Sequence, residues 1–148
     1  MTDEWSDLLA ALSEADARFL VVGAHAMAAH GVPRGTQDLD LWIEPTLDNA
    51  ARVWRALAAF GAPLETLQLT REDFTRPDTV VQLGMPPLRI DLLTSLSGLP
   101  SFANAWNGRL TATLMGRTIP ILGRAELIAN KRAAGRLKDQ ADLEALGA

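Results

Sequence analysis

The sequence predicts an α+β fold: a mixed β-sheet flanked by helices, in a single domain over 1–148. Segments whose apolar residues recur at helical spacing alternate with short segments that are typical of strands. Two pairs of expected strands are each joined by a short turn, which indicates hairpins. The sequence has no internal repeat, low-complexity tract or obvious linker, and we expect a helical C-terminal segment from about residue 123.

The first half of the chain begins with an amphipathic helix, expected because four apolar residues recur at helical spacing: Trp5, Leu8, Leu9 and Leu12. The continuous apolar run 19–22 is typical of a strand covered on both faces. An Ala-rich helix over 24–30 follows and ends at Gly31. Pro33 and Gly35 then predict an irregular loop.

A strictly alternating strand is expected over 37–43. One of its faces is apolar and carries Leu39, Leu41 and Ile43. The other face carries Asp38, Asp40 and Trp42. Thr46 is a good N-cap for the helix that follows, and Gly61 ends that helix.

The second half predicts two hairpins, with strands over 79–83 and 88–93 around a turn at 84–87, and over 110–114 and 118–122. Helical segments are expected over 71–74, 102–106, 124–134 and 138–146. The remainder of 63–76 has no clear periodicity.

Composition excludes several classes of protein. The 148 residues are enough for one ordinary core, and no apolar run approaches the roughly 18 residues that span a membrane. The acidic start of the chain is not a signal peptide, so we expect a cytoplasmic location and no membrane partner. The absence of cysteine excludes disulfides and thiolate metal sites.

Charge is unevenly distributed along the chain. The net charge of −4 argues against a strongly basic nucleic-acid-binding surface, yet the segment 117–138 has a net charge of +5. This segment could be a solvated helical face or a surface that faces phosphate in a metal-dependent enzyme.

Two carboxylates, Asp38 and Asp40, emerge on the same face of one expected strand, with Cα atoms roughly 6.5–7 Å apart. Carboxylates held this close repel each other unless a cation lies between them, and such oxygen ligands suit Mg²⁺ or Mn²⁺. Asp91, the one acid in the strand 88–93, is the best candidate for a third ligand. The alternative interpretation is that the acids lie on the solvent side of an edge strand.

Gly23 makes the catalytic interpretation more specific. A glycine at the end of a buried strand, followed at once by a helix, lets backbone N–H groups face a phosphate. The complete order of strand, glycine, helix, loop and acidic strand is more specific for such a site than the glycine turn or the acidic strand alone.

This arrangement resembles the nucleotidyltransferase superfamily, the DNA polymerase β-like fold. The segment 21–40 is closer still to the AbiEii-like, or minimal, nucleotidyltransferases, whose pattern has Gly-Gly or Gly-Ser and then Arg-x-Thr-x-Asp-x-Asp. The segments 87–94 and 130–143 also match, so the resemblance covers about 19–146.

The resemblance implies that Asp38, Asp40 and Asp91 are catalytic residues and ligands of Mg²⁺ or Mn²⁺. It also implies a set of residues around the nucleotide phosphates: Gly23, Ala24, Arg34, Thr36 and Lys131. In this set Arg34 and Thr36 would position the loop or touch phosphate. Ala24 departs from the family pattern, because many active members have a serine or glycine there and a methyl group cannot hold a phosphate oxygen.

The function implied by the resemblance is transfer of a nucleoside monophosphate from an NTP to a hydroxyl of RNA or protein. Such folds often serve in bacterial toxin–antitoxin or phage-defence systems. The acceptor would then be bound by a toxin or antitoxin partner, by a second copy of the chain or by the basic C-terminal helices. One alternative is a non-catalytic nucleotide- or partner-binding module, and another is phosphoester hydrolysis at the same metals.

Two aromatic side chains have two interpretations each, and two further features concern charge pairs. His25 could touch phosphate or pack, and Trp42 could stack on a base or belong to the core. Arg89 shares a strand face with Asp91, so a charge pair with a carboxylate of the site is expected. Lys138 and Asp142 are at the i,i+4 spacing that permits a helical ion pair.

Overall fold

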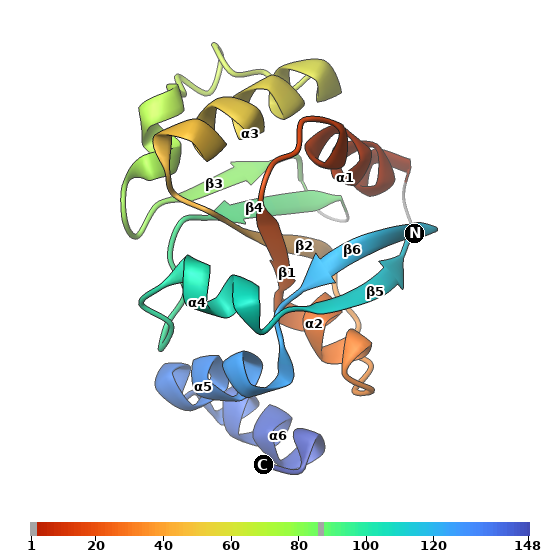
Figure 1. Ribbon diagram of the computed structural model, residues 1–148. Helices are drawn as coiled ribbons and strands as arrows, with labels where there is room; N and C mark the ends of the chain where they lie inside the picture. Colours follow the sequence, from red (N-terminus) through yellow and green to blue (C-terminus); the bar gives the residue numbers. More distant parts are fainter. Residues whose placement is uncertain (1–2, 86–87) are drawn as a thin grey trace.

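Six strands form one mixed sheet in the order β3-β4-β2-β1-β6-β5 (Figure 1). The structure is a computed structural model that describes residues 3–85 and 88–148. The strands are β1 (Phe19–Val22), β2 (Asp38–Ile43), β3 (Val80–Leu83), β4 (Arg89–Leu93), β5 (Leu110–Leu114) and β6 (Arg117–Ile121). The helices are α1 (Asp3–Glu14), α2 (Gly23–Ala29), α3 (Leu47–Phe60), η1 (Arg71–Thr75), α4 (Phe102–Asn107), α5 (Arg124–Ala134) and α6 (Leu137–Leu146).

The sheet is mixed because it combines two hairpins with longer connections. Strands β3 and β4 are antiparallel, as are β5 and β6. The central β1 runs antiparallel to β2 and parallel to β6, and β2 runs parallel to β4. Helices α1 and α3 contact each other, as do α5 and α6, and the two pairs lie at opposite ends of the molecule in Figure 1. This architecture confirms the predicted α+β fold.

The predicted elements are present, and their stated boundaries agree to within one residue. The isolated helical turn is the 3₁₀ helix η1, and the strand expected over 118–122 is β6, Arg117–Ile121. The turn expected over 84–87 includes Pro86 and Pro87, which lie outside the described residues. Among the residues described, no helix has the length and apolar character needed to cross a membrane.

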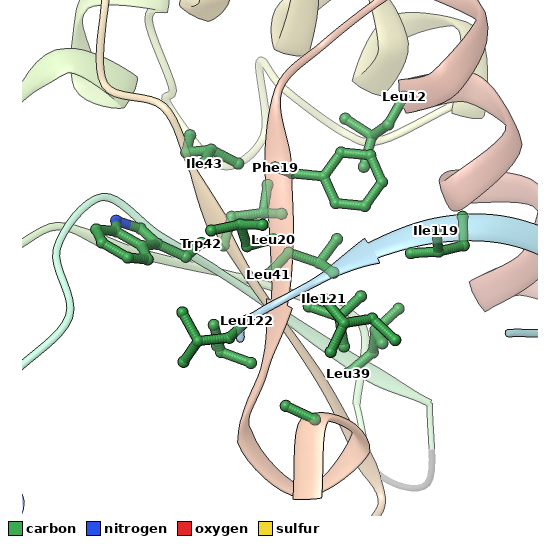
Figure 2. Close-up of a cluster of buried hydrophobic side chains, with 14 of the residues drawn as sticks. Leu12, Phe19, Leu20, Leu39, Leu41, Trp42, Ile43, Ile119, Ile121 and Leu122 are labelled. Carbon is green, nitrogen blue, oxygen red and sulfur yellow. The ribbon is translucent and has the colours of Figure 1, made fainter. Parts of the chain in front are cut away.

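The core surrounds β1, whose four residues are all buried. Figure 2 shows side chains of β2 and β6 gathered around this strand. Trp42 is 2% exposed, its Nε1 donates to the Thr94 carbonyl at 3.3 Å, and its ring meets Phe102 edge to face. Trp42 is therefore a core residue, and the base-stacking interpretation is wrong.

Strand β2 lies inside the sheet, paired with β1 on one side and with β4 on the other. The alternative that Asp38 and Asp40 decorate a solvent-facing edge strand is therefore wrong. The edges of the sheet are β3 and β5.

Asn49 holds two loops against the start of α3. Its side chain is fully buried, and Nδ2 donates to the carbonyls of Arg18 and Glu44, each at 2.9 Å. Its Oδ1 accepts from the Arg18 N–H at 2.7 Å. The predicted N-cap is also present, because Thr46 Oγ1 accepts from the Asn49 N–H at 3.2 Å. These bonds fix the chain just before β1 and just after β2, at one end of this antiparallel pair.

We expect Asn49→Ala to lower the free energy of unfolding by about 2–3 kcal/mol, because it removes the partner of the Arg18 N–H and of the Glu44 carbonyl, whereas the Arg18 carbonyl keeps its bond from the Glu44 N–H. Urea unfolding followed by circular dichroism measures this change. Asn107→Ala, at an exposed position in α4, is the matched control and should change stability by less than about 0.5 kcal/mol. Equal effects of the two substitutions would contradict this role of Asn49.

Candidate active site

The parallel pairing of β2 with β4 brings three carboxylates together. In this register Asp40 lies beside Asp91, and Asp38 lies beside Arg89. Neighbouring residues in a pleated sheet project to the same face, so all four side chains share one surface. The structure therefore brings together the three acids that were predicted from the sequence to be catalytic.

Gly23 provides the space in which Asp40 lies. It follows the last residue of β1, Val22, which pairs with Asp40 across the sheet. Its φ of +68° is in the left-handed region, which favours glycine. A Cβ at this position would collide with Oδ2 of Asp40. The glycine is thus required both by its backbone conformation and by the close approach of a carboxylate.

Arg89 lies between two of the carboxylates. Its Nη2 donates to Asp38 Oδ2 at 3.0 Å, and its Nε is 3.4 Å from Asp91 Oδ1. This confirms the charge pair expected for Arg89. The Arg89–Asp91 contact is an ion pair without hydrogen-bond geometry: within the described part of the chain, neither of those two buried atoms has a hydrogen-bond partner.

The carboxylates are destabilised in their charged forms. Burial, followed by repulsion from Asp91 and Asp38, raises the pKa of Asp40 to about 6, although Arg89 opposes this shift. Burial also raises the pKa of Asp91, against the attraction of Arg89. A site of this kind gains from added positive charge.

These three acids fit a hard divalent cation by ligand type, because Mg²⁺ and Mn²⁺ prefer carboxylate oxygens. Over residues 3–85 and 88–148, no three acidic or histidine side chains are already arranged as a metal-binding group. In the free protein Arg89 supplies the compensating charge instead. Asp91 Oδ1, which is buried without a hydrogen-bond partner among the described residues, is an available ligand atom.

The carboxylates open into a hollow of about 810 Å³. Its lining contains the three acids and Arg89, and basic residues from elsewhere in the chain: Arg34, Lys131, Arg136 and Lys138. Another hollow of about 540 Å³ has Trp42 and Phe102 in its lining, but its one ionisable side chain is Asp78. The larger hollow therefore has the charges that metal–phosphate chemistry needs.

Arg34 and Lys131 are engaged with acids of α6. Arg34 Nε and Nη2 both contact Asp142 Oδ1, at 3.0 and 2.9 Å. Lys131 Nζ lies 2.9 Å from Asp142 Oδ2 and 3.4 Å from Asp139 Oδ1. The ion pairs of Asp142 are thus formed with Arg34 and Lys131, and the expected i,i+4 pair with Lys138 is wrong. Burial raises the pKa of Asp142, but the hydrogen bonds from Lys131 and Arg34 outweigh it and lower the pKa.

Thr36 shapes the loop that leads into β2. Its Oγ1 accepts from the Asp38 N–H at 3.0 Å, so Thr36 fixes the backbone of the first carboxylate. Gly23, Ala24 and Thr36 all line the hollow. His25 does not line it: its ring packs edge to face on Trp5 of α1, with centroids 5.2 Å apart.

Sequence reasoning missed Arg136 and Asp139 as parts of this region. Asp139 is fully buried, and its carboxylate accepts from the Arg136 N–H at 3.1 Å and from Arg136 Nε at 2.7 Å. The hydrogen bonds from the Arg136 side chain lower the pKa of Asp139 to about 2, against the opposing effect of burial. Asp139 lies three residues after the N-cap Arg136, the capping-box spacing, and this signal was not recognised because the helix was expected to start at residue 138.

Compared by structure, the chain is similar to a crystal structure from Thermotoga maritima that is described as a "putative nucleotidyltransferase", with a TM-score of 0.63. The match covers 95% of this chain and 88% of that one, at 15% sequence identity. At this identity the likeness shows the fold, which is nucleotidyltransferase-like. Compared by sequence, the chain matches no protein-family profile and no curated protein.

We expect Gly23→Ala to destabilise the protein by about 1–3 kcal/mol, because a methyl group is strained at positive φ and displaces the Asp40 carboxylate. Thermal unfolding measures this loss. Gly35→Ala is the control, since a Cβ at Gly35 meets open space. If the two variants were equally stable, the close approach of Gly23 and Asp40 would be refuted.

We also expect Asp40→Asn to stabilise the metal-free protein at pH 8 by about 1–2 kcal/mol. The pKa of Asp40 is about 6 in the folded protein, above the ordinary 3.8. The folded state therefore binds more protons between about pH 4 and 6, and its stability falls as pH rises through this window. The stabilisation by Asp40→Asn should accordingly be much smaller at pH 4.

Urea unfolding in EDTA at pH 4 and pH 8 measures the difference, with Asp7→Asn in the exposed part of α1 as the control. A destabilised Asp40→Asn protein at pH 8 would contradict the proposed repulsion.

Proposed function

We propose that the chain is a divalent-cation-dependent nucleotidyltransferase of the AbiEii-like, or minimal, type. It would transfer a nucleoside monophosphate from an NTP to a hydroxyl of RNA or protein, as part of a toxin–antitoxin or phage-defence pair. The observation that carries the proposal is the group of Asp38, Asp40 and Asp91 beside Gly23, in one hollow with a basic wall. The nucleotidyltransferase-like fold supports it.

In this proposal Asp38, Asp40 and Asp91 hold Mg²⁺ or Mn²⁺, which supplies positive charge to the triphosphate and to the reacting phosphorus. The triphosphate would lie in the hollow against Gly23 and Ala24, and Lys131 and Arg34 belong to the same lining. Lys131 has a third N–H beyond its two carboxylate partners and can offer it to a phosphate oxygen.

The reaction is a substitution at the α-phosphorus. The acceptor hydroxyl oxygen forms a bond to that phosphorus, and the bond to the bridging oxygen of the β-phosphate breaks. Pyrophosphate leaves with the electron pair of the broken bond. In this proposal Asp91, whose carboxylate lines the same hollow, takes the hydroxyl proton.

One observation favours the alternative of a non-catalytic nucleotide- or partner-binding module. Ala24 lines the hollow where a serine hydroxyl would otherwise meet phosphate. In such a module the same hollow would bind a nucleotide without transferring it, and the acceptor side of the site would serve a protein partner.

Incubation with each α-labelled NTP, Mg²⁺ or Mn²⁺, small RNAs and cell proteins tests the proposal. We expect label transfer that falls at least about 100-fold in Asp38→Asn and in Asp91→Asn. Asp48→Asn in the exposed first turn of α3 should retain it.

Nucleotide binding without transfer would support the module instead. Transfer that survives in Asp38→Asn would overturn the assignment of the site, and an absence of nucleotide binding would exclude both functions.

A further inference from the structure

Arg89 lies against carboxylate oxygens that would bind a metal ion in the proposed site. It contacts one oxygen of Asp38 and one of Asp91, so its positive charge lies among the three acids. A divalent cation bound to the same oxygens would lie within a few ångströms of the guanidinium. Two cations at that separation repel each other strongly in a site partly shielded from water.

The Arg89 side chain has room to leave. It is 32% exposed and lines the hollow, whereas its backbone is fixed in β4 by pairing with β2. Among the described residues, its ion pairs are those with Asp38 and Asp91. Rotation of the side chain would therefore break these contacts without disturbing the sheet.

We propose that Arg89 is an internal counter-cation that a divalent metal displaces from Asp38 and Asp91, and that the released guanidinium then binds a phosphate of the nucleotide in the same hollow. This inference rests on the proposed function, and it adds an order of binding. The metal comes first, because Arg89 becomes available to phosphate only after it has left the carboxylates.

The chemistry of arginine suits both positions. A guanidinium has a planar set of donors that fits carboxylate and phosphate oxygens equally well. The two positions would lie in one hollow, so the movement needs side-chain rotation alone. Without metal, the nucleotide would meet carboxylates that repel its phosphates and an arginine that is already engaged.

Titration with Mn²⁺ by calorimetry tests the inference in the wild type, Arg89→Gln and Arg89→Lys. Removal of the competing cation should tighten Mn²⁺ binding by about tenfold in Arg89→Gln. Lysine keeps the positive charge but lacks the planar, bidentate donors of arginine, so it competes with Mn²⁺ less strongly. The Mn²⁺ affinity of Arg89→Lys should therefore lie between those of the wild type and Arg89→Gln. Arg117→Gln, at an exposed position outside the hollow, loses the same charge and should match the wild type.

A second titration uses a non-hydrolysable ATP analogue with saturating Mn²⁺. Arg89→Gln should bind it about tenfold more weakly than the wild type does, although it binds the metal more tightly. A residue that only stabilises the fold would not move the two affinities in opposite directions.

Unchanged or weaker Mn²⁺ binding in Arg89→Gln would overturn the inference. If that variant fails to fold, as judged by thermal unfolding, unchanged Mn²⁺ affinity in Arg89→Lys overturns it instead. If Mn²⁺ binds the wild type but not Asp40→Asn, the proposed site is supported. This holds even if the Arg89 variants bind Mn²⁺ as the wild type does, a result that refutes only the role of Arg89. An absence of Mn²⁺ binding in every variant would refute both the site and the role of Arg89.

Discussion

Mutual repulsion among three carboxylates is the constraint around which this structure is arranged. The parallel register of β2 and β4 places Asp40 beside Asp91, and Asp38 lies on the same face two residues away. Burial of Asp40, and after it repulsion from Asp91 and Asp38, raises the pKa of Asp40 to about 6. The cluster persists because the apolar faces of both strands are fixed in the core and because Arg89 supplies one opposite charge.

A complementary cluster lies in the C-terminal helices. There the acids Asp139 and Asp142 are buried, and basic residues surround them: Arg34, Lys131 and Arg136. The segment 117–138 therefore does not form a uniformly free basic face, since two of its cations are paired with α6. These pairs also connect the loop before β2 to the last helix, so the contents of the hollow depend on the C-terminal helices being in place.

Periodicity was sufficient to predict the elements and the shared face of Asp38 and Asp40, because both depend on local geometry. It could not predict that Asp40 and Asp91 are neighbours, since strand register is set by long-range packing. The same limit explains the wrong ion pair. Lys138 and Asp142 are close in sequence, but the buried Asp142 pairs with Arg34, 108 residues away, and with Lys131 of the preceding helix. The roles of the site residues in binding metal and phosphate remain predictions.

The two clusters face the same hollow, and each already contains its own opposite charge. Each cluster is therefore partly charge-balanced before any ligand arrives. Under the proposed function, binding would exchange partners rather than fill open positions: a cation would replace Arg89 among the acids, and a phosphate would compete with α6 for Lys131 and Arg34. A cation alone would pair only with the three acids, and a phosphate alone would pair only with the basic side chains. Under the proposed function, the paired charges would favour a metal–triphosphate complex over either component alone, even with Ala24 in the glycine turn.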